Sequence, residues 1–283
     1  MSDKKEHIDR EAYFRKGSIP WNRSSEDVWS EVEKRISDTP ETRVVGINSR
    51  RLLLSMAATV LVLVGVTSFM RFYTKTHKTL AGEHYQLNLP DGSVASMNVN
   101  TMVSYHPLWW WISREISMEG EAFFEVEKGS EFQVISDRGR TVVLGTSFNI
   151  YSRAGKYEVT CVTGKVKVIA GESGDQAVLE KDQKVVLMNS VLVAANREEQ
   201  LRESTAWLKD EFYFTAAPLS EVFDEISQQY GISIRYQALD YNTYTGYFKK
   251  EADIEKVLDL VCKPFGIKFE KVGEGAYHIS QDE

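Results

Sequence analysis

Cysteine is scarce in this sequence, which excludes a domain built on disulfide bonds. The 283 residues include two cysteines, Cys161 and Cys262, and the patterns described below place them in different domains. Their spacing gives neither a disulfide framework nor a metal-ligand pattern. Cys161 falls on the apolar side of an alternating segment, where we expect it to act as a small hydrophobic side chain.

Motifs for catalysis are also missing. The sequence has no Gly-x-Ser-x-Gly elbow and no phosphate-binding glycine loop. Glu119, Glu121 and Glu125 form the densest carboxylate group, but acid and base catalysis needs two carboxyl groups facing one cleft. Because Glu119 and Glu121 flank Gly120, we interpret them as solvated turn residues. The histidines are scattered without ligand spacing: His7, His77, His84, His106 and His278. We expect no enzyme activity, catalytic residue, metal site or cofactor.

The sequence also has no excess of positive charge. The chain carries a formal net charge of −7. Residues 1–51 hold 11 basic and 10 acidic residues, whereas the remainder holds 23 basic and 31 acidic residues. The acidic character of the larger part argues against direct binding of nucleic acid.

One long apolar run dominates what is present. Residues Leu52–Met70 contain no charged residue, and Arg50, Arg51 and Arg71 flank them. At roughly 1.5 Å per residue, such a helix covers most of the roughly 30 Å apolar core of a bilayer. Apolar residues surround the predicted helix without a polar stripe, which disfavours a buried helix of a soluble protein. We predict a transmembrane helix over residues 51–73.

The position of this run indicates a retained membrane anchor. A secretory signal peptide begins near the N-terminus, has a shorter apolar region and ends at a small-residue cleavage site, and this run has none of these features. Basic residues are more frequent before the run than after it, which favours a cytoplasmic N-terminus. The flanking residues counted are Lys34, Arg35, Arg43, Arg50 and Arg51 before the run, and Arg71, Lys75 and Lys78 after it.

Residues 1–50 are predicted to form a cytoplasmic segment that contains one amphipathic helix. Ser24 or Ser25 is a suitable N-cap, and an apolar stripe follows at helical spacing. Residues 38–49 are expected to form a polar tether. The stripe is too small to fold alone, so it favours binding to a partner protein, with a helix lying on the lipid or a disordered segment as alternatives. Its residues are Val28, Trp29, Val32 and Ile36.

After a short predicted linker at residues 74–82, the pattern changes to short alternating runs cut by glycine. Tyr157, Val159 and Cys161 alternate with polar residues, as a half-buried strand requires. We predict an all-β domain of about ten short strands over residues 80–196.

Four phrases in this domain appear in a recognisable order. They are LPDGS at Leu89–Ser93, with Asp-Gly suited to a hairpin turn; MEGEAFFEV at Met118–Val126, expected to join two strands; VLGTSFNI at Val143–Ile150; and VTGKVKV at Val162–Val168. Together they resemble the periplasmic domain of the ferric-citrate-regulator (FecR) family of anti-sigma factors.

A tryptophan triplet, Trp109-Trp110-Trp111, departs from this pattern. Neighbouring residues of an extended chain cannot all face one core, so at least one indole is expected at the surface. The triplet is either a contact patch for a partner or the membrane interface, or a hairpin tip folded over its own sheet.

The C-terminal part, residues 207–281, contains an internal repeat at an offset of 35 residues. In each copy an apolar helical stripe ends at a glycine that precedes a strand. This pattern predicts the order β-α-β-β-α-β-β, with both helices on one face of a small mixed sheet. The arrangement resembles the secretin/TonB short N-terminal (STN) module, an α+β fold. Pro264 is expected to kink or end the second helix near Cys262. The repeat aligns Leu219, Val222, Phe223, Ile226, Tyr230 and Gly231 with Ile254, Val257, Leu258, Val261, Phe265 and Gly266.

The sequence therefore predicts a multi-domain protein that resembles FecR-type anti-sigma factors of the Bacteroidetes type. The resemblance implies a single-pass protein of the inner membrane, with its C-terminal domains in the periplasm. Its implied partners are a cytoplasmic ECF sigma factor and the signalling (STN) domain of an outer-membrane TonB-dependent transporter, in the regulation of iron or glycan uptake. The alternative is a membrane-tethered periplasmic scaffold, or a protein that binds carbohydrate or the cell wall.

Overall fold

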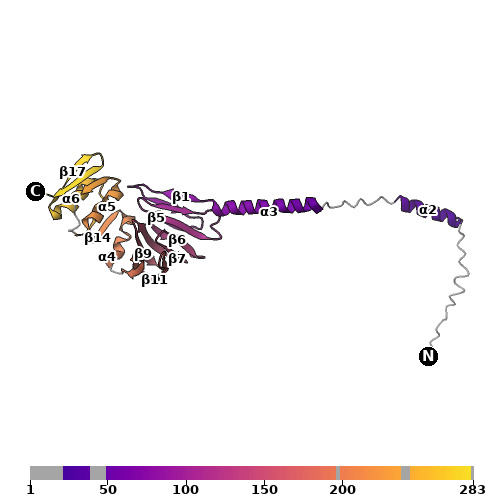
Figure 1. Ribbon diagram of the computed structural model, residues 1–283, viewed down its shortest axis with the longest axis horizontal. Coiled ribbons are helices and arrows are strands. Elements are labelled where there is room, and N and C mark those ends of the chain that lie inside the picture. The colour runs from indigo at the N-terminus through magenta and orange to yellow at the C-terminus, as the bar shows by residue number, and fades with distance from the viewer. Residues whose placement is uncertain (1–21, 39–48, 196–197, 237–242, 282–283) are drawn as a thin grey trace, which may run out of the picture. The chain divides into compact units, whose positions relative to one another are not determined.

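The computed structural model describes residues 22–38, 49–195, 198–236 and 243–281 (Figure 1). The predictions for residues 1–21, and most of the predicted polar tether, lie outside these described residues.

The first described element is α2, Ser25–Ser37. Ser24 is its N-cap, one of the two candidates that the sequence offered. The hydroxyl of Ser24 accepts a hydrogen bond from Asp27 N at 3.2 Å, and the Asp27 carboxylate accepts one from Ser24 N at 3.3 Å. This reciprocal capping box satisfies amide groups that would otherwise be unpaired in the first turn.

The apolar run forms α3, Ser49–Phe72. Within the described residues, α3 is the one helix long and apolar enough to cross a membrane, and none of its most apolar window is buried against the protein. Its limits differ slightly from the predicted 51–73, because the helix begins before the arginine pair and ends one residue earlier.

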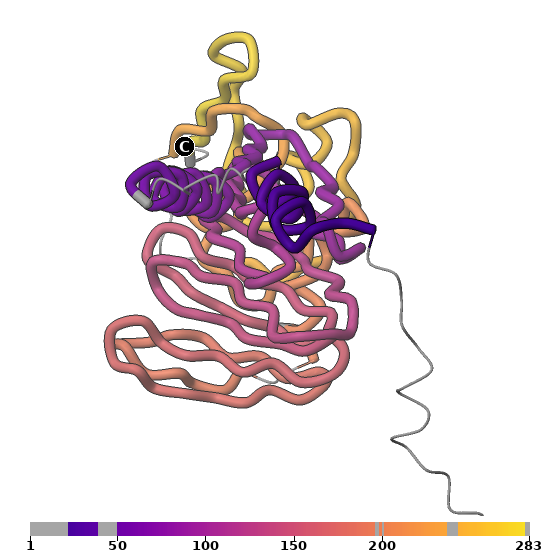
Figure 2. The backbone as a smooth tube through the Cα atoms, turned by 90° about the vertical axis from the view of Figure 1, so that its right-hand side faces the viewer, coloured from indigo at the N-terminus to yellow at the C-terminus, as the bar shows by residue number. Residues whose placement is uncertain are grey.

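The β-domain begins sooner and has more strands than expected. Thirteen strands form one sheet, and the first of them, β1, lies inside the segment predicted to be a linker. β1 pairs with β4 in antiparallel register, with Lys75 opposite Tyr105. The strands are β1 Lys75–Lys78, β2 Tyr85–Asn88, β3 Val94–Met97, β4 Met102–Tyr105, β5 Arg114–Glu125, β6 Phe132–Ile135, β7 Gly139–Val143, β8 Ser147–Arg153, β9 Lys156–Thr163, β10 Lys165–Ala170, β11 Gln176–Glu180, β12 Gln183–Met188 and β13 Val191–Ala194. The chain can be followed through them in Figure 2, from the purple β1 to the salmon β13.

The strand β5 joins the two halves of this sheet. Its first part pairs with β4 and β6, and its second part pairs with β3 and β8. The prediction that Met118–Val126 joins two strands is therefore wrong: the segment through Glu125 is the second part of one long strand. The β5–β6 pair is parallel, whereas the other ladders of the sheet are antiparallel within the described residues.

Gly120 makes the change of partners possible. Its φ is +111°, and a Cβ at this position would lie 2.5 Å from Thr101 Oγ1 and 2.6 Å from Thr101 Cα. Only glycine combines that backbone conformation with so close an approach of a neighbouring chain. Gly120 thus lies inside a strand, at the point where β5 passes from one half of the sheet to the other.

The predicted hairpin turn at Leu89–Ser93 is confirmed. It connects β2 to β3, Leu89 N donates to Ser93 O at 2.8 Å, and Gly92 has a φ of +88°. Cys161 is buried in the β-domain core, as expected, and Cys262 is buried in the C-terminal core. Both are free thiols.

The C-terminal part has the predicted order of elements but not the predicted sheet. Its described residues form two sheets: β14 pairs with β16, and β15 and β17 flank β18. The alternation of apolar residues identifies strands but not their hydrogen-bonded neighbours, so a single sheet was the wrong inference. The elements are α4 Glu198–Glu203, η1 Ala206–Lys209, β14 Glu211–Pro218, α5 Leu219–Tyr230, β15 Ser233–Tyr236, β16 Thr243–Lys249, α6 Ile254–Cys262, η2 Lys263–Phe265, β17 Ile267–Gly273 and β18 Ala276–Gln281.

The two helices of the repeat share one core. Leu219 and Phe223 of α5 and Leu258 of α6 are all fully buried in the same cluster. Gly231 and Gly266 end the two copies in left-handed conformations, with φ of +65° and +61°. The helix α6 stops at Cys262, as Pro264 predicts, and continues as a short 3-10 turn.

We expect Gly120→Ala to destabilise the β-domain by on the order of 3 kcal/mol, because the new methyl group meets the backbone of Thr101. The matched control is Gly155→Ala. Gly155 has a φ of +78°, but nothing lies within 4 Å of the place that a Cβ would occupy, so this change should cost only about 1 kcal/mol. Chemical unfolding of the detergent-solubilised protein, followed by tryptophan fluorescence, measures both. If both variants lost the same free energy of unfolding, a side chain at position 120 would not clash with Thr101.

Candidate functional site

The predicted sigma-binding stripe lies on one face of α2. Trp29 and Ile36 are 71% and 70% exposed, Val32 is also exposed, and Val28 is half-buried. No residue of Ser25–Ser37 is buried. Two ion pairs of Glu31, with Arg23 at 2.7 Å and Arg35 at 3.3 Å, lie on the polar part of the helix. Within the described residues, α2 therefore presents an exposed apolar surface.

The three arginines predicted to flank the anchor lie at the ends of α3. Arg50 and Arg51 are in the first turn and exposed, and Arg71 is in the last turn and half-buried. The guanidinium carbon of Arg71 lies 5.9 Å from the centre of the Phe72 ring. Long basic side chains in these positions can reach the lipid headgroups while their stems remain beside apolar surface.

The tryptophan triplet divides between core and surface. Trp110 is fully buried, with its ring edge-on to Tyr105 and Phe132 at centroid distances of 5.6 and 5.8 Å. Trp109 is half-buried, whereas Trp111 is 79% exposed. An exposed indole is thus present, and its role as a contact surface stays a prediction.

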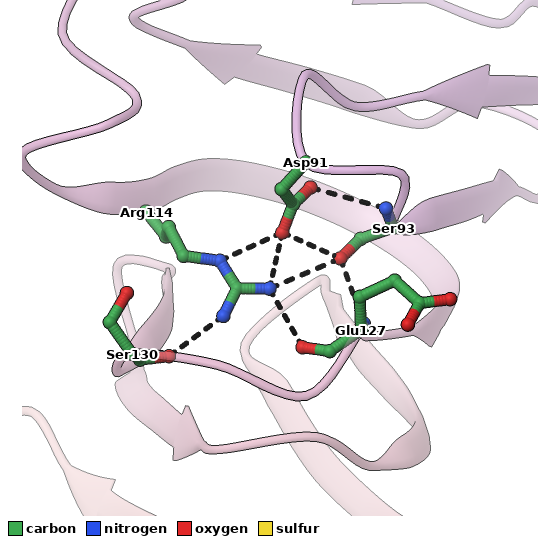
Figure 3. Close-up of polar contacts among 5 residues, drawn as sticks. All are labelled: Asp91, Ser93, Arg114, Glu127 and Ser130. Carbon is green, nitrogen blue, oxygen red and sulfur yellow. Dashed lines mark hydrogen bonds and ion pairs between the residues drawn. The ribbon is translucent and has the colours of Figure 1, made fainter.

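A buried ion pair explains the residue types of the Leu89–Ser93 turn (Figure 3). Arg114 Nε donates to Asp91 Oδ2 at 2.7 Å, and Nη2 donates to the same oxygen. The Ser93 hydroxyl also donates to Asp91 Oδ2, at 2.8 Å. Burial by itself would raise the pKa of Asp91, but the hydrogen bonds from Ser93 and Arg114 outweigh it and hold that pKa below its ordinary value.

The remaining donors of Arg114 fix the next connection of the chain. Nη1 donates to Ser130 O at 2.7 Å, and Nη2 donates to Glu127 O at 2.9 Å. Every contact in this cluster joins chain segments of the β-domain, so the cluster positions the beginning of β5.

Glu121 occupies a second buried polar site, immediately after Gly120. Its Oε2 accepts from Asn98 Nδ2 at 2.8 Å, and its Oε1 accepts from Asn149 Nδ2 at 2.7 Å. Removal from solvent, and to a lesser degree the charge of Glu225, raises the pKa of Glu121 to about 7; the amides of the two asparagines and the charge of Arg153 act in the opposite direction.

The hydrogen bonds continue from Glu121 into the C-terminal part. Asn98 Oδ1 accepts from Gln229 Nε2 at 2.9 Å, and Gln229 Oε1 lies 3.0 Å from His84 Nε2. Beside this chain of contacts, Arg153 donates to the side chain of Gln228. The helix α5, which carries Gln228 and Gln229, is thereby connected to the β-domain by side chains that are buried or partly buried.

A cavity of about 520 Å³ adjoins this connection. Its lining combines β-strand residues such as Asn149 and Lys184 with Trp207 and residues of α5. Lys184 forms an ion pair with Glu158 at 2.6 Å, and Lys156 forms one with Glu221 at 2.8 Å. Burial raises the pKa of Glu203, another lining residue, to about 7.

The sequence interpretation of Glu121 as a solvated turn residue is wrong. Glu119 is exposed, whereas Glu121 is buried. In the structure Glu121 lies within β5, directly before Ala122, and Ala122 and Phe124 belong to the core of the β-domain. The carboxylate of Glu121 is hydrogen-bonded to Asn98 and Asn149, and Asn98 in turn contacts Gln229 of α5, whose position no local pattern reveals. Among the described residues, no group of three or more histidine, cysteine, aspartate or glutamate side chains is arranged to hold a metal ion.

Comparison with known proteins gives two family matches. Residues 75–167 match the family model described as "FecR protein", and residues 211–279 match the one described as "FecR, C-terminal". These ranges correspond to β1–β10 and to β14–β18. No curated protein matches the chain.

Two crystal structures of Parabacteroides distasonis ATCC 8503 proteins, each described as a "putative anti-sigma factor", are similar to the chain. The first, at 2.50 Å resolution, is 27% identical with a TM-score of 0.67, and the match covers 75% of this chain and 100% of that one. The second, at 1.65 Å, is 28% identical with a TM-score of 0.66, and the match covers 74% and 100%.

The raised pKa of Glu121 predicts a pH-dependent stability. Between its ordinary value near 4.5 and about 7, the folded protein keeps a proton on Glu121 that the unfolded chain has lost. The contribution of Glu121 to stability therefore falls as pH rises through this range. We expect Glu121→Gln to equal the wild type near pH 4.5 and to exceed its unfolding free energy by on the order of 2 kcal/mol at pH 8.

Glu119→Gln is the matched control, because Glu119 lies on the other side of Gly120 and is exposed. It should follow the wild type at every pH in thermal unfolding experiments. A Glu121→Gln variant that is less stable than the wild type at pH 8 would show that the ionised carboxylate stabilises the fold.

Proposed function

The chain belongs to the FecR family of anti-sigma factors, and on that basis we propose that it carries a signal across the inner membrane. In this proposal α3 is a single membrane anchor with the N-terminus in the cytoplasm. The cytoplasmic segment binds an ECF sigma factor, and the two C-terminal domains receive the signal of an outer-membrane TonB-dependent transporter.

The order of the parts is the observation that carries the proposal. An exposed amphipathic helix comes first, an apolar helix of membrane-spanning length follows, and the two matched domains come last. The amphipathic helix has a surface suited to a protein partner, and the apolar helix has one suited to lipid. The two matched domains have surfaces suited to an aqueous compartment.

On the cytoplasmic side, the α2 stripe supports a protein partner. Burying the indole of Trp29 together with aliphatic side chains contributes several kcal/mol at roughly 25 cal/mol per Å², offset by the cost of ordering the segment. Tryptophan is also frequent among the residues that contribute most to protein interfaces.

On the opposite side, the sheet of β14 and β16 supports a partner that adds a strand or packs a helix. In the described part of the chain, β14 pairs with β16 alone, so its other edge has unpaired backbone groups. Tyr213 and Tyr247 lie beside each other on these strands, with ring centroids 6.1 Å apart. A transporter signalling domain of the STN type, which this C-terminal domain resembles, has the same kind of edge.

We expect the full-length protein, solubilised from membranes, to co-purify with a sigma subunit of RNA polymerase. Trp29→Ala should weaken that binding at least about tenfold, because the truncation removes the largest exposed side chain of the stripe. Titration of the purified sigma factor against the protein in nanodiscs measures the affinity.

Lys34→Ala is the matched control, because Lys34 lies on the polar side of α2 and should leave the affinity unchanged. Trp21→Ala, at a position outside the described residues, should have a smaller effect because it precedes the helix. If Trp29→Ala binds normally, the stripe is not the sigma contact. If no sigma subunit co-purifies at all, a tethered scaffold or a protein that binds carbohydrate or the cell wall becomes the better interpretation.

The proposed orientation gives a separate expectation. Alkaline phosphatase is active only outside the cytoplasm, so a fusion after residue 200 should be active and a fusion after residue 45 inactive. Activity assays of both fusions, normalised to their expression, measure this. The reverse pattern would place the sigma-binding segment in the wrong compartment and overturn the proposal.

A further inference from the structure

The connection between β4 and β5, residues 106–113, lies at the point where the chain leaves α3. Only Tyr73 and Thr74 separate the end of α3 from the beginning of β1. Nδ1 of His106 lies 3.1 Å from Thr74 Oγ1 and 3.3 Å from the carbonyl oxygen of Tyr73. The connection therefore begins in direct contact with the two residues that follow α3.

The pairing of β1 with β4 places the connection of residues 106–113 near the end of α3. β1 leads away from α3, and its antiparallel partner β4 returns toward it, with Lys75 opposite Tyr105. The residues after Tyr105 must emerge at the end of the sheet nearest to α3. Trp111 is five residues beyond His106, so it lies no more than about 18 Å away even if the chain between them were extended. The chain is in fact folded, because Trp109 N donates to His106 O and Ile112 N donates to Trp109 O.

The surface of this connection is apolar. Trp111 and Ile112 are 79% and 69% exposed, and Leu108 is exposed as well. Leu144, also exposed, follows β7 at the same end of the sheet, because β5 and β6 begin there and Val143 pairs with Phe132. Scattered exposed apolar residues are ordinary, but several large ones gathered at one end of a domain indicate a contact surface.

The connection cannot fold inward to cover these side chains. Trp110 is buried between Tyr105 and Phe132 and anchors the middle of the connection in the core. Since neighbouring residues of this segment point in different directions, the position of Trp110 keeps Trp111 outside. The exposure of Trp111 is thus built into the fold.

We propose that residues 108–112 are a second membrane contact, in which Trp111, Ile112 and Leu108 enter the interfacial layer of the leaflet at which α3 ends. The inference rests on the proposed function in one respect, the membrane location of α3. Lipid is the occupant that the structure favours, because the connection is continuous with the anchor through Tyr73 and Thr74. Indole rings prefer the interface, where the ring is partly buried and its N–H remains hydrated.

A second contact would restrict the motion of the β-domain. With α3 alone, the domain could swing about the two residues that follow the helix. Attachment at α3 and at Trp111 would define which face of the domain looks away from the membrane.

Site-specific fluorescence quenching tests the proposal on the full-length protein. Both native thiols are buried, and burial raises the pKa of Cys161 to about 11 and that of Cys262 to about 12, so a maleimide dye will react selectively with a new surface cysteine. We choose Ile112→Cys, which keeps Trp111 in place. The labelled protein is reconstituted into vesicles of phosphatidylcholine and phosphatidylglycerol, with and without lipids brominated high in the acyl chain.

Two other positions calibrate the experiment. Val178→Cys, on β11, is an exposed apolar position of the same domain, and Val62→Cys lies within α3. We expect quenching at position 112 to be at least about threefold greater than at position 178, as for a side chain in the interfacial layer. Adding Trp111→Ser to Ile112→Cys should reduce the quenching at position 112.

The outcomes separate this inference from the proposed function. Quenching at positions 62 and 112 but not at 178 supports the second contact. If the dye at position 62 is quenched but quenching at position 112 equals that at position 178, the second contact is overturned. The membrane location of α3 then still holds. Absence of quenching at 62 overturns the membrane location of α3, and the second contact with it.

Discussion

The structure of the β-domain depends on one strand that belongs to both halves of a sheet. β5 hydrogen-bonds to β4 and β6 over its first part and to β3 and β8 over its second. Such a change of partners requires a sharp local change of backbone direction, and Gly120 supplies it with a φ of +111° against the backbone of Thr101. Any side chain at that position would separate the strands that β5 holds together.

Two buried polar groups lie at defined points of the same strand and have different consequences. Arg114 begins β5 and is matched by Asp91, Ser93 and two carbonyl groups, so its charge is compensated entirely within one domain. Removing one partner of such a pair would leave a buried charge uncompensated, which costs more than the pair contributes. Glu121 is bonded to two amides and forms no ion pair among the described residues, and its removal from solvent raises the pKa of its carboxyl to about 7.

The position of Glu121 gives it a role beyond the β-domain. Through Asn98 it contacts Gln229 of α5, so a charge on Glu121 would be felt where the two matched domains meet. At the other end of the same strand system, β4 brings His106 against the residues that follow α3. The end of α3 and the contact with the C-terminal domain are thus linked by strands that neighbour each other in one sheet. These contacts form one contiguous physical path between the two places.

The sequence by itself determined the features that depend on local pattern. The uncharged run Leu52–Met70, the capped stripe on α2, the turn at Leu89–Ser93 and the repeat that ends at Gly231 and Gly266 follow from composition, spacing and the conformational freedom of glycine. The four ordered phrases of the β-domain identified its family. Each of these features is recognised from residues that are close together in the sequence or that follow the period of a helix or strand.

Only the tertiary structure decided which strands pair and what covers each outward face. The glycine beside Glu121 indicated a solvated turn residue, yet Glu121 is buried, and its partner Asn98 contacts Gln229 of α5, about one hundred residues later in the chain. The same is true of the triplet: the pattern required an exposed indole, but the packing of Trp110 against Tyr105 and Phe132 determined that it is Trp111. Two C-terminal sheets formed where one was expected. The physical reason is common to all three, because hydrogen-bond partners and burial are set by contacts between segments distant in sequence, and local periodicity specifies only which side of a strand is apolar.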